Sequence, residues 1–97
     1  MEETSDVSKF YVYILLSLKD LGLYIGFTSN LQKRLILHSR GLVTATKFRK
    51  PLKLIHYEYF INISDAKSRE RFLKSGFGRD QLRQFLKRTF LAYAKYS

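Results

Sequence analysis

The most constraining feature of this sequence is a pair of short apolar runs joined by a turn, with a helix-forming stretch directly after them. Residues 10–17 and 23–28 are both rich in Tyr, Ile and Leu, and residues 19–22 read Lys-Asp-Leu-Gly. Aromatic and β-branched runs of this length, separated by a turn that contains Gly, are typical of a β-hairpin. The sequence therefore predicts two antiparallel strands, with the first run as the central strand of a sheet.

The register of this hairpin decides which tyrosines can act together. If Leu18 pairs with Leu23, Tyr13 lies opposite Thr28. Because strand side chains alternate between the two faces of a sheet, this pairing puts Tyr13 and Tyr24 on the same face. A slip of one residue would separate them, so the prediction of a shared face depends on the register.

A helix is predicted to begin within residues 28–30 and to end just before Gly41. Thr, Ser and Asn at positions 28–30 can each cap a helix N-terminus, and Gly is a common residue just past a helix end. Arg34 and His38 lie one turn apart beside the apolar stripe of this helix. We expect both side chains to project together toward the edge of the sheet.

The second half of the chain predicts a basic loop, a third strand and two more helices. The loop covers residues 41–51 and the strand covers residues 54–61. The next helix is capped by Ser64 or Asp65 and closed by Gly76 and Gly78, and a last amphipathic helix begins near Asp80. The fold class is α+β. We expect one domain at residues 9–92, a flexible tail at 1–8 and a C-terminal tail at 93–97.

Charge and composition narrow the function classes. The net charge is +10, and no carboxylate occurs between Asp20 and Glu58, a span that holds seven Lys and Arg residues. Such a field attracts polyanions and favours nucleic acid as partner, over a basic protein with merely solvated lysines or a ribosomal or membrane-surface protein. The absence of Cys excludes disulfides and thiolate metal sites. Without a long apolar run or a basic leader, we expect a cytoplasmic protein that does not enter the membrane.

Glu70 is a carboxylate in an unusual place. It falls one turn from both Ala66 and Leu73, on the apolar side of its predicted helix. A carboxylate there is costly unless a positive group meets it. An ion pair with a nearby Arg is the commoner reason. A metal site is the alternative, because one carboxylate is adequate for Mg²⁺ that keeps its waters and shares a substrate phosphate.

The other candidate residues each have two interpretations. Arg34 carries a planar, charged fork suited to a phosphate, or it is a solvated helix residue. His38 could be a base near neutral pH, or a half-buried residue at the edge of the core. Tyr13 and Tyr24 are ordinary strand residues, and a phenol would need a nearby cation or metal-bound water to act as a base. These residues predict a basic, nucleic-acid-binding α+β domain and do not by themselves indicate an enzyme.

Several segments in order resemble the GIY-YIG nuclease superfamily. Residues 11–13 read Tyr-Val-Tyr, residues 24–26 read Tyr-Ile-Gly, and Arg34 lies in the helix that follows. Residues 41–47 and 68–71 look like the small stand-alone bacterial members, which in turn resemble the N-terminal nuclease domain of the protein that makes the incisions in bacterial excision repair. The resemblance covers about residues 9–90.

This resemblance implies a small three-stranded antiparallel sheet flanked by helices, and a metal-dependent endonuclease that hydrolyses phosphodiester bonds in DNA, with RNA not excluded. It implies Mg²⁺ or Mn²⁺ on Glu70 and stabilisation of the scissile phosphate by Arg34. Tyr13, Tyr24 and His38 would line the site, one of them helping to activate the attacking water. Flanking phosphates would be gripped without base reading by Lys33, Lys47, Arg49 and Lys50.

Two positions depart from the family pattern. Phe27 stands where the repair nucleases carry a Lys, and no Asn follows Glu70. Because no specificity domain is added, we expect recognition of nucleic-acid structure in repair or recombination, or targeting by a partner protein. A catalytically silent nucleic-acid-binding module on the same fold is the competing hypothesis, and a structural protein that docks on an acidic partner is a third. The sequence does not predict the oligomeric state.

Overall fold

A computed structural model describes residues 8–93 of the chain. The expected tails at 1–8 and 93–97 therefore lie outside the described residues, except for Ser8 and Tyr93, which ends the last helix. The elements in chain order are β1 (Phe10–Ser17), β2 (Leu23–Thr28), α1 (Leu31–Ser39), β3 (Leu52–Phe60), α2 (Ile63–Lys74), α3 (Gly76–Phe85) and α4 (Lys87–Tyr93).

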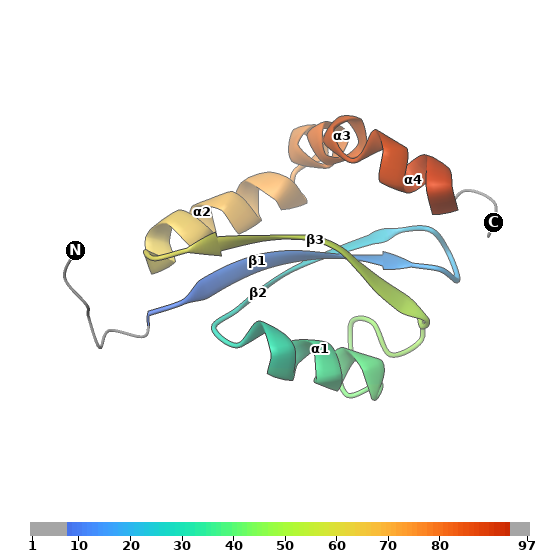
Figure 1. The fold of residues 1–97 in the computed structure, drawn as a ribbon, viewed down its shortest axis with the longest axis horizontal. Helices are drawn as coiled ribbons and strands as arrows, with labels where there is room; N and C mark the ends of the chain where they lie inside the picture. Colours follow the sequence, from blue (N-terminus) through green and yellow to red (C-terminus); the bar gives the residue numbers. More distant parts are fainter. Residues whose placement is uncertain (1–7, 94–97) are drawn as a thin grey trace.

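The three strands form one antiparallel sheet in the order β2-β1-β3, which confirms the predicted α+β class and the central place of the first strand. Helix α1 covers one face of this sheet, and helices α2, α3 and α4 lie on the other face (Figure 1). The strand β2 is therefore an edge strand with helices on both of its sides.

The hairpin register differs by two residues from the prediction. Leu16 pairs with Leu23, and Tyr13 lies opposite Gly26. The reason is the turn, which is wider than expected: the Ser17 hydroxyl accepts hydrogen bonds from the backbone N–H groups of Lys19 and Asp20, so the strand ends at Ser17. Because the shift is an even number of residues, the predicted shared face of Tyr13 and Tyr24 is preserved.

The hydrophobic core lies between the sheet and the helices of the α2 face. Alternate residues of the two hairpin strands point to it, as period-2 alternation requires. They pack against apolar side chains of α2 and α3. The buried members are Val12, Ile14, Leu16, Leu23, Ile25, Ala66, Leu73 and Leu82. The opposite, α1-facing set of β1 consists of Tyr11, Tyr13, Leu15 and Ser17, and it is this more polar set that builds the site described below.

The second half of the chain differs from the prediction at four points, and the first is that three helices follow β3, where two were predicted with the last beginning near Asp80. The third strand is Leu52–Phe60, and Asn62 caps α2 in place of Ser64 or Asp65, because its side chain accepts the hydrogen bonds of both residues' N–H groups. Gly76 and Gly78 do not close a helix. Ser75 ends α2 and caps α3, and both glycines lie inside α3. A Cβ on Gly78 would collide with the carbonyl oxygen of Phe72, so the Gly allows the close approach of these two helices.

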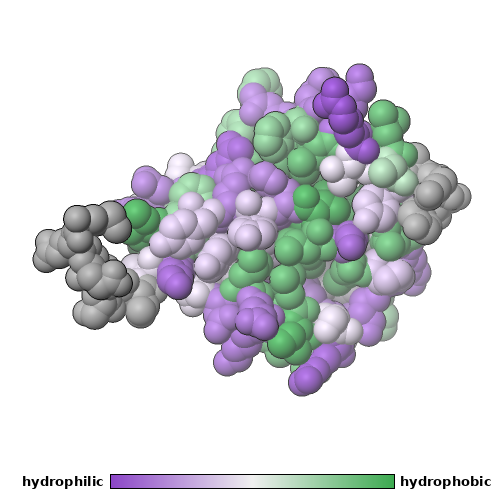
Figure 2. All heavy atoms as spheres, in the orientation of Figure 1, coloured by the Kyte–Doolittle hydropathy of each residue, from purple (hydrophilic) through white to green (hydrophobic). Residues whose placement is uncertain are grey.

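No helix in the described part of the chain combines the length and the apolar character needed to cross a membrane. Figure 2 shows hydrophobic side chains reaching the surface in the middle of the face in view, where β3 passes between α1 and α3 in Figure 1. Hydrophilic side chains surround this tract above and below.

Candidate active site

The centre of the α1 face is Tyr13, which is fully buried. It lies opposite Gly26 in the sheet, and its phenol ring runs across the Gly. A Cβ at position 26 would collide with the ring carbon that bears the Tyr13 hydroxyl. The Gly of the Tyr-Ile-Gly segment is therefore required by this close approach, because any side chain there would displace Tyr13.

Tyr24 and His38 complete a cluster of three rings around this position. The ring centroids are separated by 6.2 Å for Tyr13 and Tyr24, 5.6 Å for Tyr13 and His38, and 5.1 Å for Tyr24 and His38. The Tyr13 hydroxyl is hydrogen-bonded to His38 Nε2 at 2.8 Å. On the other side of the imidazole, His38 Nδ1 is hydrogen-bonded to the Thr46 hydroxyl, also at 2.8 Å. Tyr13, His38 and Thr46 thus form a continuous hydrogen-bonded chain.

Burial determines the protonation states of Tyr13 and His38 in this hydrogen-bonded chain. Burial raises the pKa of Tyr13 to about 12, although the neighbouring Arg34 guanidinium acts to lower it. Burial, with a further contribution from the charge of Arg34, lowers the pKa of His38 to about 4. His38 is therefore neutral at pH 7, which favours its interpretation as a residue of the core edge over that of a base that titrates near neutrality.

Arg34 reaches this cluster from α1. The Tyr13 hydroxyl beside the guanidinium is the main cause that raises the pKa of Arg34, and it acts against burial; Tyr24 contributes in the same direction. Arg34 forms no ion pair with any described residue, and its buried Nε has no hydrogen-bond partner. Buried polar atoms in folded proteins are usually hydrogen-bonded, so this Nε is a position at which a water or an anion can bind.

Glu70 lies on the other helical layer. Its carboxylate is 15% exposed and pairs with Lys74 at 2.9 Å and Lys67 at 3.9 Å, all on α2. No hydrogen bond or ion pair among residues 8–93 joins it to the Tyr13 cluster. The predicted pairing with an Arg is not found, because the partners are lysines.

The position of Glu70 on α2 nevertheless directs it toward the β2 edge. Ala66 and Leu73 face the core, and helical spacing puts Glu70 and Lys67 on the same side of that stripe. The Lys67 ammonium lies 3.9 Å from the ring centroid of Phe27, a residue of β2. Glu70 and Arg34 therefore flank the edge strand from opposite faces of the sheet.

The donor set suits a hard, hydrated divalent metal ion. No group of three or more His, Cys, Asp or Glu among the described residues could enclose a metal. A single, largely buried carboxylate provides hard oxygen donors and leaves the remaining coordination positions to water and phosphate. This fits Mg²⁺, which dehydrates reluctantly and commonly shares a substrate phosphate, and it does not fit a closed structural site.

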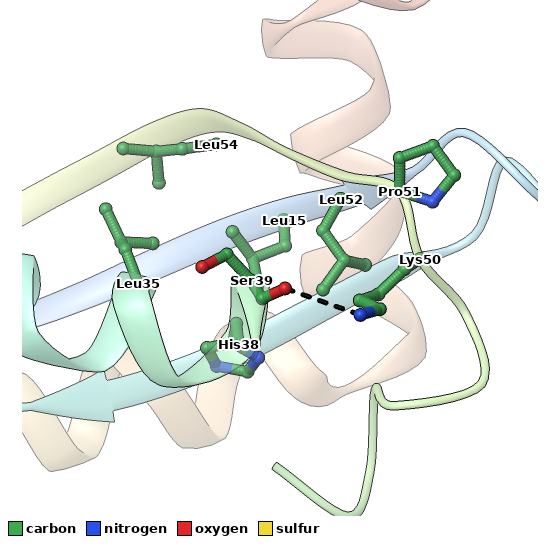
Figure 3. A pocket seen from close by; sticks show the side chains of 8 residues that line it. All are labelled: Leu15, Leu35, His38, Ser39, Lys50, Pro51, Leu52 and Leu54. Carbon is green, nitrogen blue, oxygen red and sulfur yellow. Dashed lines mark hydrogen bonds between the residues drawn. The ribbon is translucent and has the colours of Figure 1, made fainter. Parts of the chain in front are cut away.

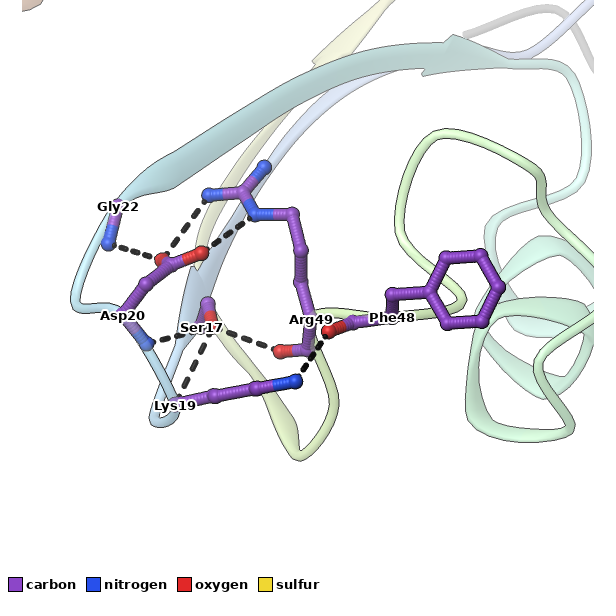
Figure 4. Close-up of polar contacts among 6 residues, drawn as sticks. All are labelled: Ser17, Lys19, Asp20, Gly22, Phe48 and Arg49. Atoms are coloured by element: carbon purple, nitrogen blue, oxygen red, sulfur yellow. Dashed lines mark hydrogen bonds and ion pairs between the residues drawn. The ribbon is translucent and has the colours of Figure 1, made fainter.

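The four predicted phosphate-gripping residues are not equivalent. Lys33 and Lys47 are exposed, and Lys50 donates to the backbone carbonyl of Ser39 at 3.4 Å. Arg49 is engaged: its guanidinium binds both carboxylate oxygens of Asp20, at 2.9 and 3.2 Å (Figure 4). Arg49 is the main cause that lowers the pKa of Asp20 to about 2. The ion pair between Arg49 and Asp20 thus holds the basic loop against the hairpin turn.

Two further contacts tie this loop to the turn. The Ser17 hydroxyl donates to the Arg49 carbonyl at 2.6 Å, and Lys19 Nζ donates to the Phe48 carbonyl at 2.9 Å (Figure 4). These contacts hold the loop that carries Thr46, and through Thr46 they help to orient His38.

A cavity of about 610 Å³ lies on the other flank of α1, between that helix and β3 (Figure 3). Its walls are mainly leucines and Pro51, with Lys50 at one end and His38 at its base. Tyr13, Tyr24 and Arg34 do not line it. The cavity is therefore adjacent to the ring cluster but is separate from the polar groups that could act on a phosphate.

Sequence reasoning missed Thr46 as part of the site. Thr46 is completely buried although it lies in a basic loop without apolar periodicity. Its spacing from His38 carries no helical or strand signal, because the two residues are joined only by the path of the loop. The only available signal was its position inside the segment 41–47, which resembles family members.

Phe27, which departs from the family pattern, lies next to a positively charged side chain of another element. Phe27 carries no charge itself, but Lys67 of α2 lies over its ring at 3.9 Å. A positive group thus occupies the neighbourhood of this position by means of a cation–π contact.

The chain is similar to known proteins over most of its length. The family model described as the GIY-YIG catalytic domain matches residues 9–84. The chain is 46% identical over 65 residues to a UPF0213 protein of Clostridium perfringens, an alignment that covers 66% of this chain and 69% of the relative. It is 40% identical over 76 residues to a UPF0213 protein of Staphylococcus haemolyticus, covering 77% and 90% of the two chains. No solved structure matches the chain.

Proposed function

Because the chain belongs to the GIY-YIG nuclease family, we propose that it is an endonuclease that hydrolyses phosphodiester bonds in DNA with the help of a divalent metal ion. The observation that carries this proposal is the state of Arg34. A guanidinium with a buried, unpartnered Nε, two phenols beside it and no carboxylate opposite is a ready site for an anion. The scissile phosphate is the anion that this family of domains acts on.

Arg34 would stabilise the charge that develops on the non-bridging oxygens during attack. A fixed cation in a partly buried site needs little reorganisation when this charge appears. The two-pronged guanidinium also orients the phosphate, which a lysine could not do as well.

Tyr24 is the residue that we assign to the attacking water. Tyr13 and His38 are both almost inaccessible to solvent, whereas Tyr24 is only partly buried. Tyr13 and His38 would instead hold the Tyr24 ring and Arg34 in place, with Thr46 fixing the imidazole. Among the three residues that the resemblance offers for this step, His38 is less suited, because a neutral imidazole with both nitrogens hydrogen-bonded has no free position for water.

Glu70 would hold the metal ion, which supplies Lewis-acid stabilisation of the phosphate when it is bound. Lys67 and Lys74 now neutralise the Glu70 carboxylate, so we expect them to release it when the metal binds. Both lysines are about half exposed and can turn to solvent at little cost.

The substrate would be recognised through its backbone and shape. The exposed lysines Lys33, Lys47 and Lys50 would contact phosphates on either side of the site, while Arg49 would act mainly by holding the loop. The absence of charged residues other than cations between Asp20 and Glu58 favours such sequence-independent binding. We propose a structure-directed role in DNA repair or recombination, in the cytoplasm and with a partner protein as a possible source of targeting.

The test is cleavage of supercoiled, branched and single-stranded DNA with Mg²⁺, with Mn²⁺ and with a chelator. Glu70→Gln removes the charge and keeps the size of the side chain, and we expect it to abolish metal-dependent cutting. Asp65→Asn is the matched control, because Asp65 is an exposed acid in the first turn of the same helix. Cutting that survives in Glu70→Gln would overturn the metal assignment. Tight DNA binding without cutting on every substrate would favour the catalytically silent binding module.

A further inference from the structure

Three tyrosines gather on the α1 face of the sheet beside the candidate active site. They are Tyr11 of β1 and Tyr57 and Tyr59 of β3, and we call them the tyrosine platform. Ring centroids are 6.1 Å apart for Tyr11 and Tyr57 and 5.6 Å apart for Tyr11 and Tyr59. Tyr57 and Tyr59 are each 52% exposed.

We infer that the tyrosine platform stacks the unpaired bases of a nucleic-acid strand, so that the substrate class contains single-stranded nucleic acid next to the scissile phosphate. This inference rests on the proposed nuclease function and specifies the substrate of the same site. Exposed aromatic rings on a sheet face bind single strands without sequence preference, since every base presents a flat face to stack on.

The exposure of these rings is not explained by the core. The core cluster lies on the opposite face of the sheet, and Tyr57 and Tyr59 do not belong to it. Their tilted and edge-on contacts with Tyr11 restrict the rings to fixed positions. A pre-organised group of rings loses little conformational entropy when a base stacks on it.

The surroundings of the platform suit a polyanion. A depression of about 490 Å³ is lined by Tyr11 and Tyr57 together with Lys9, Asn30 and Gln32, and by no acidic residue. The Lys provides a contact for a phosphate, and the two amide side chains provide donors and acceptors for base edges. The charge of the depression therefore favours an anionic ligand, and the exposed rings beside it favour a nucleic acid, whose bases can stack on them.

The platform is connected to the active site by the sheet register. Tyr57 pairs with Tyr13 across β1 and β3, so the platform begins one strand away from the ring cluster. Asn30, which lines the depression, also caps the helix that carries Arg34. A strand that passes the N-terminus of α1 can thus place its bases on the platform and a phosphate at Arg34.

A second hollow lies next to this depression, because Leu35 lines both the depression and the cavity of Figure 3. Leucine side chains form an apolar floor in both hollows, and each hollow has one lysine, Lys9 in the depression and Lys50 in the cavity. A duplex cannot use this floor, because its bases are already stacked on each other; an unpaired strand can.

The test is binding measured without metal, so that it does not depend on cleavage. Fluorescence anisotropy would compare a labelled thymidine oligonucleotide of about 12 nucleotides, its uridine counterpart and a duplex of the same length. The double variant Tyr57→Ala/Tyr59→Ala is expected to weaken single-strand binding by about 10- to 100-fold and to change duplex binding by less than about twofold. Tyr57→Phe/Tyr59→Phe should bind like the wild type, because stacking needs the ring and not the hydroxyl.

Phe77→Ala is the matched control for loss of an exposed aromatic ring. Phe77 lies on α3 and is 68% exposed, away from the α1 face. Unchanged single-strand binding by the double Ala variant would overturn the inference, as would an equal loss for duplex. A change of oligomeric state in that variant, measured by light scattering, would assign the platform to a contact between copies and also overturn it.

The same experiment separates this inference from the proposed function. Tyr-dependent binding of single strands by a protein that cuts nothing would uphold the platform and reject the nuclease. Metal-dependent cutting of duplex DNA at the same rate by the wild type and by the double Ala variant would uphold the nuclease and reject the platform. The arm with the uridine strand shows whether the unpaired strand is DNA, RNA or either.

Discussion

Two arginines face the same sheet from opposite sides and differ in how they are satisfied. Arg69 of α2 binds both carboxylate oxygens of Glu58, at 2.9 and 3.1 Å, and His56 binds one of them at 3.0 Å. Burial opposes the ionised form of Glu58, but the hydrogen bonds from Arg69 and His56 lower its pKa overall. Arg34 of α1 has only two phenols beside it and a buried Nε without a partner.

The difference separates a structural pair from a functional group. The Arg69–Glu58 pair joins α2 to β3, and its two opposite charges neutralise each other. Arg34 is held by its surroundings without being neutralised. A partly buried guanidinium without a carboxylate partner among the described residues can still bind an anion, and this is why we place the phosphate there.

Replacing each of these arginines by Ala in separate variants tests the difference most strongly. We expect Arg34→Ala to reduce kcat/KM for DNA cleavage by about 10²- to 10³-fold with little loss of stability. Arg69→Ala should lower the free energy of unfolding by about 1–2 kcal/mol, because it leaves Glu58 half-buried and without its arginine, and should affect the rate much less. Cleavage rates below the melting transition and urea unfolding measure the two effects. The opposite pattern would reject the comparison.

Gly26→Ala tests whether the α1 face depends on the packing of Tyr13. The new Cβ would collide with the phenol ring, so the ring must move and the Tyr13–His38 hydrogen bond must break. We expect a loss of about 1–3 kcal/mol in unfolding free energy, together with loss of cleavage. Gly76→Ala is the control, since nothing lies within 4 Å of its added Cβ. Equal thermal melting of the two variants would contradict the described packing.

Thr46→Val tests the end of the hydrogen-bonded chain. The change leaves His38 Nδ1 buried without a partner, at a cost of about 1–2 kcal/mol. Thr46→Ser keeps the hydroxyl and should restore most of the stability and the cleavage rate. If Val and Ser variants behaved alike in thermal melting and cleavage, the hydroxyl would have no part in orienting His38.

The pH dependence of stability tests the burial of His38. The folded pKa of His38, about 4, lies below the ordinary value of 6.5, so the unfolded chain takes up the proton first as the pH falls. Stability from neutral His38 is therefore complete above pH 6.5 and is lost toward pH 4, by about 1.4 kcal/mol per pH unit within that window. Urea unfolding at several pH values measures the slope. His38→Gln should flatten it, and an unchanged slope would show that His38 titrates normally.

The sequence predicted the order of the elements because each carries a local signal. Alternation marked β1 and β2, and the predicted stop at Gly41 lies where the backbone has a positive φ of 73°. Local signals failed where a longer-range contact decided the boundary. Asn62 displaced the expected caps, and Ser17 ended the strand by bonding the turn and the basic loop.

Family motifs identified Tyr13, Tyr24, Arg34, His38 and Glu70 as candidates, but only the fold showed that they divide into two groups. Four of them meet on the α1 face, and Glu70 approaches from α2 across the edge strand. Helical and strand periodicity predict which face of an element a residue occupies. They do not predict which other element covers that face.

The sequence by itself determined the α+β class, the central hairpin, the shared face of two tyrosines and the strongly basic charge of the chain, because periodicity and charge are properties of short segments. Only the tertiary structure decided that His38 is neutral, that Thr46 orients it, that Arg49 is occupied by Asp20 and that Arg34 lacks a partner. Burial and pairing depend on groups that are far apart in the chain and are brought together by its path. The same side chain therefore becomes a structural pair or a site for a ligand according to what the fold places opposite it.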